Sequence, residues 1–274
     1  MNNYDMFWKN GFLHVPDIFN SEEIDNLTMD LDWMMVDWAE NSPGWSGPWR
    51  RELMDEETEK KSTLTAMHDL QFYSKFWFDA VSNEKIVSLI SELIGPEVEL
   101  HHSTMHIKPP GTGHPFPMHQ DWAFYKHKDE RFIDVLVHLD DTSHENGEIR
   151  FLTGSHINGP LEHIVKNDDG TTCTPHLLQK DYNLKDSIPV PAKKGDVVMF
   201  NINTVHGSYI NQTSVPRKLV RIGYRNPDNQ QLEGQSFGRP GLILKGRRNR
   251  DNGQELFSSN GPRPIREEDT FGVK

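Results

Sequence analysis

The chain has 274 residues and a formal net charge of -12, from 29 basic and 41 acidic side chains. This acidic balance gives no general attraction to phosphate backbones, so we expect no nucleic-acid partner. The single cysteine, Cys173, excludes an intramolecular disulfide and a multi-cysteine zinc site, and fits a reducing cytoplasm. No run approaches the roughly 18 apolar residues that span a bilayer, so we expect a cytoplasmic protein without membrane contact.

We expect one domain over residues 1–274, because all-β domains of this length are common. Its first part, about 1–96, has helical patterns. A short helix is predicted to end at Gly11 and to be followed by the strand-like FLHVP. A second helix, capped at Asn20-Ser21, covers the apolar repeat of residues 24–41, and a third covers residues 83–94.

Aromatic residues and methionines in this first part allow two interpretations. In the second helix we expect the apolar stripe to pack in the core; it consists of Trp33, Met34, Met35 and Trp38. The segment 42–63 mixes Pro, Gly, Trp and charged residues, and is interpreted as a surface loop or insertion. Because long loops often form lids over sites, Trp45 and Trp49 are candidates for substrate contact.

Strand patterns follow the third helix. Short β-rich runs separated by turn residues occur at 98–108, 132–139, 149–152, 188–190, 196–202 and 218–225. They predict a mainly β core, about 97–228, folded as a double-stranded β-helix (a cupin-like jelly roll) under a helical cover. The end of the chain, about 246–274, is interpreted as a polar tail.

Three residues are candidate metal ligands. His119 and Asp121 are two positions apart, so in an extended strand both side chains would point to one face. His206 follows another predicted strand and its turn. Two histidines and one carboxylate form the facial triad of non-haem Fe(II) oxygenases. The number of histidines alone does not indicate a metal site. Among the 14 present, we expect His127, His144, His163 and His176 to be exposed.

A candidate carboxylate-binding pair lies downstream of His206. The planar guanidinium of Arg217 suits bidentate pairing with a carboxylate, and Ser208 can donate a hydroxyl to it. Arg221 is a rival, because alternate residues of the same strand share one face. Zinc with the same three ligands could serve hydrolysis, but a hydrolase has no need of this pair.

Three segments resemble the phytanoyl-CoA dioxygenase family of Fe(II)- and 2-oxoglutarate-dependent oxygenases. They are HSTMHIKPPGTGHPFPMHQDW, HLDDTSHENGEIRFLTGSH and GDVVMFNINTVHGSYINQTSVPR, and the N-terminal FWKNGFLHVPDIFNSEEID resembles the opening of that family. The resemblance covers most of residues 98–225. It implies an enzyme that uses Fe(II), 2-oxoglutarate and O2 and releases succinate and CO2.

The resemblance assigns roles to individual residues. It implies that His119, Asp121 and His206 are catalytic iron ligands, and that Arg217 and Ser208 bind the distal carboxylate of 2-oxoglutarate. His102 matches a further co-substrate contact, and Leu136 lies on a strand that should border the co-substrate. A carboxylate at 121 favours hydroxylation, because halogenating relatives have a small residue there.

The substrate is less well defined by the sequence. Four residues near the triad are candidates to line its pocket: Gln120, Trp122, Phe124 and Tyr125. A small or mid-sized free metabolite is favoured, since the basic residues Lys126, Lys128 and Arg131 that a CoA ester would need are interrupted by acids. The alternatives are an acyl-CoA hydroxylase and a catalytically silent metal-binding jelly roll. The sequence leaves the oligomeric state open.

Overall fold

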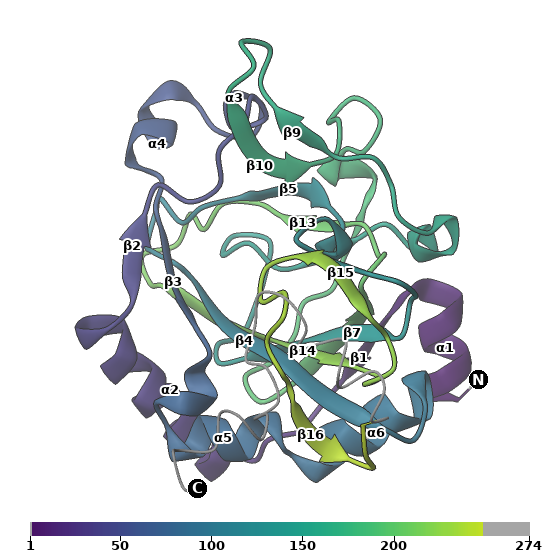
Figure 1. Ribbon diagram of the computed structural model, residues 1–274. Coiled ribbons are helices and arrows are strands. Elements are labelled where there is room, and N and C mark those ends of the chain that lie inside the picture. The colour runs from purple at the N-terminus through teal and green to yellow at the C-terminus, as the bar shows by residue number, and fades with distance from the viewer. Residues whose placement is uncertain (1, 249–274) are drawn as a thin grey trace, which may run out of the picture.

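The structure, a computed structural model, describes residues 2–248. The largest part of the fold is a twisted eight-stranded sheet (Figure 1). Seven of its strands lie in the order β1-β12-β7-β14-β4-β3-β2, and the eighth, β16, pairs with β4. The strands of this large sheet are β1 (Phe12–Val15), β2 (Glu40–Ser42), β3 (Leu64–His68), β4 (Val98–Lys108), β7 (Phe132–His138), β12 (Val197–Asn201), β14 (Arg217–Arg225) and β16 (Leu242–Lys245). All of its pairings are antiparallel.

A second, smaller sheet faces the large one. It has the order β11-β8-β13-β5, with β5 (Phe116–His119), β8 (Arg150–Phe151), β11 (Ile188–Pro189) and β13 (His206–Ser208). Aromatic contacts join the two sheets: Phe151 of the smaller sheet stacks on Phe12 at 4.5 Å between ring centroids and packs against Phe200. The predicted mainly β jelly roll is thereby confirmed.

Two further strand pairs lie outside these sheets. They are β9 (Ile164–Lys166) with β10 (Thr172–His176), and β6 (Tyr125–His127) with β15 (Gln231–Gly234).

The large sheet alternates between apolar and polar faces. On β14, Val220, Ile222 and Tyr224 belong to the apolar core on the helix side. Arg217 and Arg221, on the other face, line a pocket between the sheets. This alternation follows from the two-residue period of a strand, and it places charged side chains inside the jelly roll.

Helices cover the outer face of the large sheet (Figure 1). These helices are α1 (Asn3–Asn10), α2 (Ser21–Asp37), α5 (Lys75–Val81) and α6 (Glu84–Ile94). Two short helices, α3 (Arg50–Leu53) and α4 (Glu56–Lys61), lie apart from them, near β9 and β10. The predicted caps are confirmed: α2 begins with a capping box between Asn20 and Glu23, and α1 ends at Gly11 in the left-handed region, with φ 86°. None of the helices in residues 2–248 is long and apolar enough to cross a membrane.

Two expectations for the helical part need correction. The side of α2 that packs on the core consists of Ile24, Leu27, Leu31 and Met34, so only Met34 of the predicted stripe is fully buried. Trp33 and Trp38 are about half exposed, at 47% and 52%, and contact each other on the surface. Trp33 lies off the three-to-four spacing that faces the sheet, and Trp38 follows the last residue of the helix, Asp37.

The segment 42–63 is more ordered than a surface loop. It contains α3 and α4, and Trp49 is 1% exposed in a small apolar cluster with Met54 and Ile210.

Two of the four histidines expected on the surface are buried. His127 in β6 and His176 in β10 are each 2% exposed. His163 is partly buried, and only His144 of the four is exposed. The predicted tail lies largely outside the described residues, and the single domain stays a prediction.

Candidate active site

The three candidate ligands meet between the sheets. His119 is the last residue of β5, and it is paired in register with His206, the first residue of β13. Asp121 begins the short 3-10 helix η2 (Asp121–Ala123), so the expectation that positions 119 and 121 share one strand is wrong. The turn of η2 nevertheless brings the carboxylate back: one ligand atom from each of the three residues lies within 4.8 Å of the others.

Backbone carbonyls orient both imidazole rings. Nδ1 of His119 lies 2.7 Å from the carbonyl oxygen of Pro117, and Nδ1 of His206 lies 2.9 Å from that of Thr204. A carbonyl only accepts, so Nδ1 carries the proton in each ring and Nε2 presents a lone pair. Both Nε2 atoms face Asp121 Oδ1, at 3.5 and 3.9 Å. The two rings are therefore prepared to bind a cation through Nε2.

The electrostatics of the three residues also favour a bound cation. Burial, and then His119, lowers the pKa of His206 to about 3, so this ring is neutral at pH 7. Burial would raise the pKa of Asp121, but Arg221 and His206 outweigh it and hold that pKa well below its ordinary value. Oδ2 of Asp121 is buried without a hydrogen-bond partner among residues 2–248. The neutral imidazole of His206 and the ionised, under-coordinated carboxylate of Asp121 fit a divalent metal with open positions.

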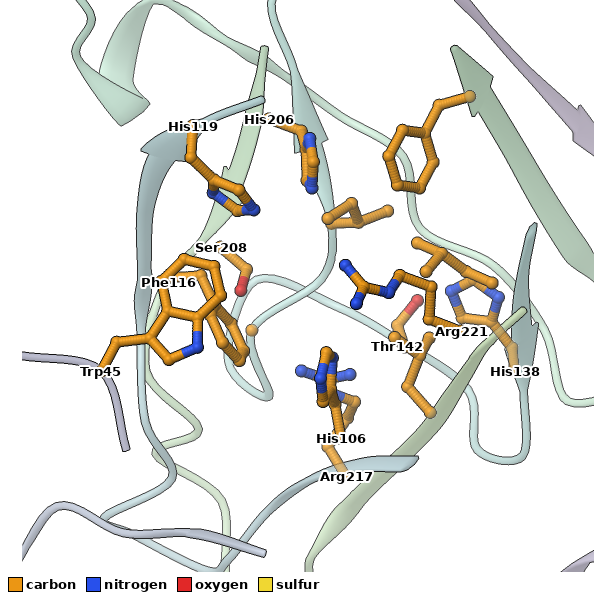
Figure 2. A pocket seen from close by; sticks show the side chains of 15 residues that line it. Trp45, His106, Phe116, His119, His138, Thr142, His206, Ser208, Arg217 and Arg221 are labelled. Carbon is orange, nitrogen blue, oxygen red and sulfur yellow. The ribbon is translucent and has the colours of Figure 1, made fainter. Parts of the chain in front are cut away.

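A pocket extends from these ligands into the jelly roll, and we call it the inner pocket. Its lining includes His106, Leu136, His138, Ser208, Arg217 and Arg221 (Figure 2). Arg217 begins β14 opposite Lys108, is 4% exposed, and makes no ion pair in the described part of the chain. Burial lowers the pKa of Arg217 to about 10, which still leaves it charged at pH 7. A buried, unpaired guanidinium fits a carboxylate ligand.

Arg221 has a different role from Arg217. Its Nη1 lies 2.8 Å from Asp121 Oδ1, and its Nε lies 3.8 Å from Asp134 Oδ1. Burial disfavours the charge, but Asp121, Tyr125 and Asp134 together raise the pKa of Arg221. Arg221 is already paired with carboxylates, whereas Arg217 forms no ion pair with residues 2–248. Of the two arginines that the sequence left open, Arg217 is therefore favoured as the partner of a bound carboxylate.

Lys108 holds the hydroxyl of Ser208. Its Nζ lies 2.7 Å from Ser208 Oγ and also donates to the carbonyl oxygen of Tyr209. Because Lys108 is the donor in this hydrogen bond, Ser208 keeps its own proton to donate to a ligand beside Arg217. Burial, followed by the charge of Arg217, lowers the pKa of Lys108 well below its ordinary value.

Three inner-face residues were not anticipated from the sequence: His106, Lys108 and His138. His138 is fully buried, and both of its ring nitrogens lack a hydrogen-bond partner among the described residues. Burial, then Arg217, lowers its pKa to about 3, so the ring is neutral. The signal that could have found them is the alternation of their strands, since each shares an inner face with a predicted site or pocket residue.

His102 is placed differently from the prediction. It lies on the inner face of β4 but does not line the inner pocket with Arg217 and Ser208. Its Nδ1 is 2.7 Å from Nδ1 of His101, and its Nε2 is 4.0 Å from Asp134 Oδ1. The role of His102 as a 2-oxoglutarate contact therefore stays a prediction.

The four candidate substrate residues divide into two pairs. The side-chain amide of Gln120 bonds only to backbone groups: it donates to the carbonyl oxygens of Gly159 and Asn203 and accepts from the N–H of Leu161. Trp122 donates its indole N–H to the carbonyl of His127, away from the ligands. These two residues support the loop, and we leave both out of the candidate site.

Phe124 and Tyr125 do lie near the ligands. The Phe124 ring packs on His119 at 5.8 Å, and the Tyr125 hydroxyl donates to Asp134 at 2.8 Å. Trp45, a candidate for substrate contact, also packs edge-on against His119, at 4.7 Å, and lines the inner pocket (Figure 2). The segment that carries Trp45 is anchored, because its backbone N–H donates to His114 and its carbonyl accepts from Arg50.

Comparisons with known proteins agree with this geometry. The phytanoyl-CoA dioxygenase family model matches residues 7–219. A probable alpha-ketoglutarate-dependent hypophosphite dioxygenase of Stutzerimonas stutzeri is 29% identical over 231 residues, which cover 82% of this chain and 78% of the relative. A 2-aminoethylphosphonate dioxygenase of an uncultured bacterium is 28% identical over 233 residues, covering 83% and 81%.

Solved structures share the fold at low identity. A non-haem alpha-ketoglutarate-dependent carbocyclase from nogalamycin biosynthesis is similar with a TM-score of 0.69 and 18% identity, over 89% of this chain and 93% of that one. EctD of S. alaskensis, solved with 2-oxoglutarate and 5-hydroxyectoine, is similar with a TM-score of 0.64 and 21% identity, over 84% and 77%.

Proposed function

The chain belongs to the phytanoyl-CoA dioxygenase family and is a 2-oxoglutarate-dependent non-haem iron dioxygenase, and we propose that it hydroxylates an aliphatic carbon of a small polar metabolite. The observation that carries this proposal is the opening of one buried pocket onto both a three-residue metal site and an unpaired arginine. Binding of a metal alone would not require the buried guanidinium of Arg217 in the same pocket. A dicarboxylate co-substrate that also binds the metal requires both.

Each residue of the proposed site has a physical task. His119, Asp121 and His206 would hold Fe(II), and Arg217 with the Ser208 hydroxyl would bind the distal carboxylate of 2-oxoglutarate. With O2 these groups supply the oxidation and release succinate and CO2. Leu136 and Phe200 line the pocket between its polar ends. They exclude water from the reacting atoms, which strengthens the charge pairing inside.

The small size of the substrate is supported by surface charge and by the relatives. The relatives reported above are named for hypophosphite and for 2-aminoethylphosphonate. Of the basic residues that could have bound the phosphates of a CoA ester, Lys126 pairs with Glu233 and Arg131 pairs with Asp129. This pairing disfavours the acyl-CoA alternative.

Anaerobic addition of Fe(II) and 2-oxoglutarate tests the proposal. We expect the weak metal-to-ligand charge-transfer band that the chelated co-substrate produces, and we expect it to disappear in Asp121→Ala. Absence of the band in the wild-type protein would contradict the proposal and favour a silent metal-binding protein or a zinc hydrolase. Release of succinate in the presence of a substrate would separate an active enzyme from a silent one.

A further inference from the structure

The inner face of the large sheet carries a second polar region beyond Arg221. Arg221 on β14 is in register with Thr104 on β4, and Thr104 is in register with His68 on β3. The His68 ring points to the same face, because its Nδ1 lies 3.0 Å from Thr104 Oγ1. One row of side chains therefore runs from the partner of Asp121 to the end of β3.

An open cavity of about 340 Å³ lies at the end of this row, and we call it the outer cavity. Its lining contains no apolar side chain: it consists of His68, Asp69, His102, Gln235, Ser236 and Arg239. It opens on the opposite side of Arg221 from Arg217. Arg221, the partner of Asp121, thus lies between this cavity and Arg217. A wall of this composition suits a small polar molecule.

Backbone strain is concentrated at the outer cavity. Asp69 and Ser236 both have φ of 61°, in the left-handed region that is unfavourable for residues other than glycine, and only Asp17 shares this property within residues 2–248. Asp69 stands at the end of β3 and Ser236 in the turn after β15, so two walls of one cavity are strained. Such strained conformations cluster at ligand-binding sites.

Arg239 is the charged group best placed to bind a ligand in this cavity. Its Nη1 donates to Asp69 Oδ2 at 2.8 Å, and its side chain is 42% exposed. Its remaining N–H groups have no partner in the described part of the chain. An exposed pair of this kind is worth little on its own, so an incoming anion can share or replace Asp69. The buried cation Arg221, whose field reaches His68 and His102, adds to the attraction.

We propose that the outer cavity is the substrate site and that it binds a small molecule through an oxyanion group, a carboxylate, phosphonate or phosphinate, paired with Arg239. This inference rests on the proposed function, since it places the substrate relative to the iron site. It gives His102, predicted as a co-substrate contact, a place in the wall of the substrate site. It also makes Asp69 a competitor of the substrate for the same guanidinium.

Calorimetric titration of the anaerobic complex with Fe(II) and saturating 2-oxoglutarate tests the proposal. The ligands are ethylphosphonate, propionate and propionamide, the last being the neutral counterpart of propionate. Saturating 2-oxoglutarate occupies Arg217, so that this residue does not bind the probes. We expect either or both anions to bind and the amide not to bind; the comparison of the two anions identifies the preferred oxyanion.

Three variants make the assignment specific. Arg239→Gln should weaken anion binding by on the order of tenfold or more, because a charged hydrogen bond is lost. Arg131→Gln is the matched control: Arg131 is 40% exposed and paired with Asp129, and its loss should change nothing. Asp69→Asn should strengthen anion binding, since asparagine tolerates the left-handed backbone and removes the competing charge.

The possible failures are distinguishable. Equal binding of propionamide and propionate, or unchanged anion binding in Arg239→Gln, would overturn the substrate-site proposal while 2-oxoglutarate binding and the proposed function stand. If 2-oxoglutarate itself does not bind, the proposed function fails. Ethylphosphonate can then be titrated into the Arg217→Met protein and into the double variant that also carries Arg239→Gln. Weaker binding in the double variant would support the outer cavity as the anion site, and equal binding in the two proteins would reject it.

Discussion

Arg221 and the candidate iron ligand Asp121 form a buried ion pair in which Nη1 lies 2.8 Å from Oδ1, the oxygen that also faces both imidazoles. In the metal-free protein the guanidinium thus supplies the positive charge that a metal would otherwise bring to this carboxylate. When a divalent metal ion binds Asp121, the ion and the Arg221 guanidinium become neighbours of like charge. Asp134 Oδ1, 3.8 Å from Arg221 Nε, can then pair with the guanidinium in place of Asp121.

Replacing Arg221 with methionine should therefore destabilise the metal-free protein more than the metal-bound one. Removal of one partner of a buried ion pair costs about 3–5 kcal/mol. We expect a lower Tm without metal and a larger rise of Tm on adding Co(II) or Mn(II) than in the wild type, measured by differential scanning calorimetry.

Arg221→Lys, which keeps the charge, is the control and should behave like the wild type. A metal-induced rise of Tm that is smaller in Arg221→Met than in the wild type would contradict charge substitution. It would show that Arg221 acts mainly by orienting Asp121.

Arg217→Met should separate binding of the co-substrate from binding of the metal. Each hydrogen bond to a charged group contributes about 1.5–3 kcal/mol, so loss of a paired guanidinium should raise the Kd for 2-oxoglutarate by roughly a hundredfold. Titration of Mn(II) in the absence of 2-oxoglutarate should give an unchanged metal affinity. Collapse of metal binding with an unchanged 2-oxoglutarate affinity would show that Arg217 is wrongly assigned.

The sequence correctly predicted that His119, Asp121 and His206 come together in the fold. Imidazole and carboxylate side chains seldom lie in a fully buried position without a partner, so HxD beside a predicted strand and a distant His206 were informative. The exact geometry could not be predicted: Asp121 reaches the site through the turn of η2 and not along the strand.

The inner-face residues show what strand parity can and cannot decide. The alternation of side chains along a strand puts Arg217 and Arg221 on one face, but it does not show which of them pairs with a carboxylate of the chain. That depends on Asp121 and Asp134, which come from η2 and β7 and approach Arg221 only in the folded sheet pair. For the same reason the sequence could not show which cavity His102 lines, because position along β4 decides between the two cavities.

His138 should contribute to binding of the co-substrate. Its two ring nitrogens are buried and without partners in the described part of the chain, and it lines the inner pocket near Arg217. His138→Leu should weaken 2-oxoglutarate binding by on the order of tenfold, because a donor to the carboxylate is lost. The same change should stabilise the protein without ligand, because an unsatisfied buried polar group costs about 1–3 kcal/mol.

Opposite signs in two measurements make this prediction specific. Urea denaturation reports the free energy of unfolding, and calorimetric titration reports the affinity for 2-oxoglutarate. His138→Gln, which keeps a donor, should recover part of the affinity. A His138→Leu protein that is less stable and binds 2-oxoglutarate normally would assign His138 to packing alone.

Buried neutral histidines should make the protein lose stability as the solution becomes mildly acidic. Burial lowers the pKa of His114 to about 2 and those of His127 and His138 to about 3. In the unfolded chain a histidine titrates near 6.5, so between that pH and about 3 the unfolded state binds more protons. The stability contributed by each neutral ring is complete above about pH 6.5 and decreases as the pH falls, by up to about 1.4 kcal/mol per pH unit.

Urea denaturation at pH 7.5 and pH 5 measures this effect before most carboxylates titrate. We expect a lower midpoint at pH 5 with an unchanged m-value. His138→Leu should reduce the difference between the two pH values, because one of the groups that must stay neutral is gone. The exposed His144 provides the control, since His144→Leu should leave the difference unchanged. An equal difference in wild type and His138→Leu would show that His138 is protonated in the folded protein.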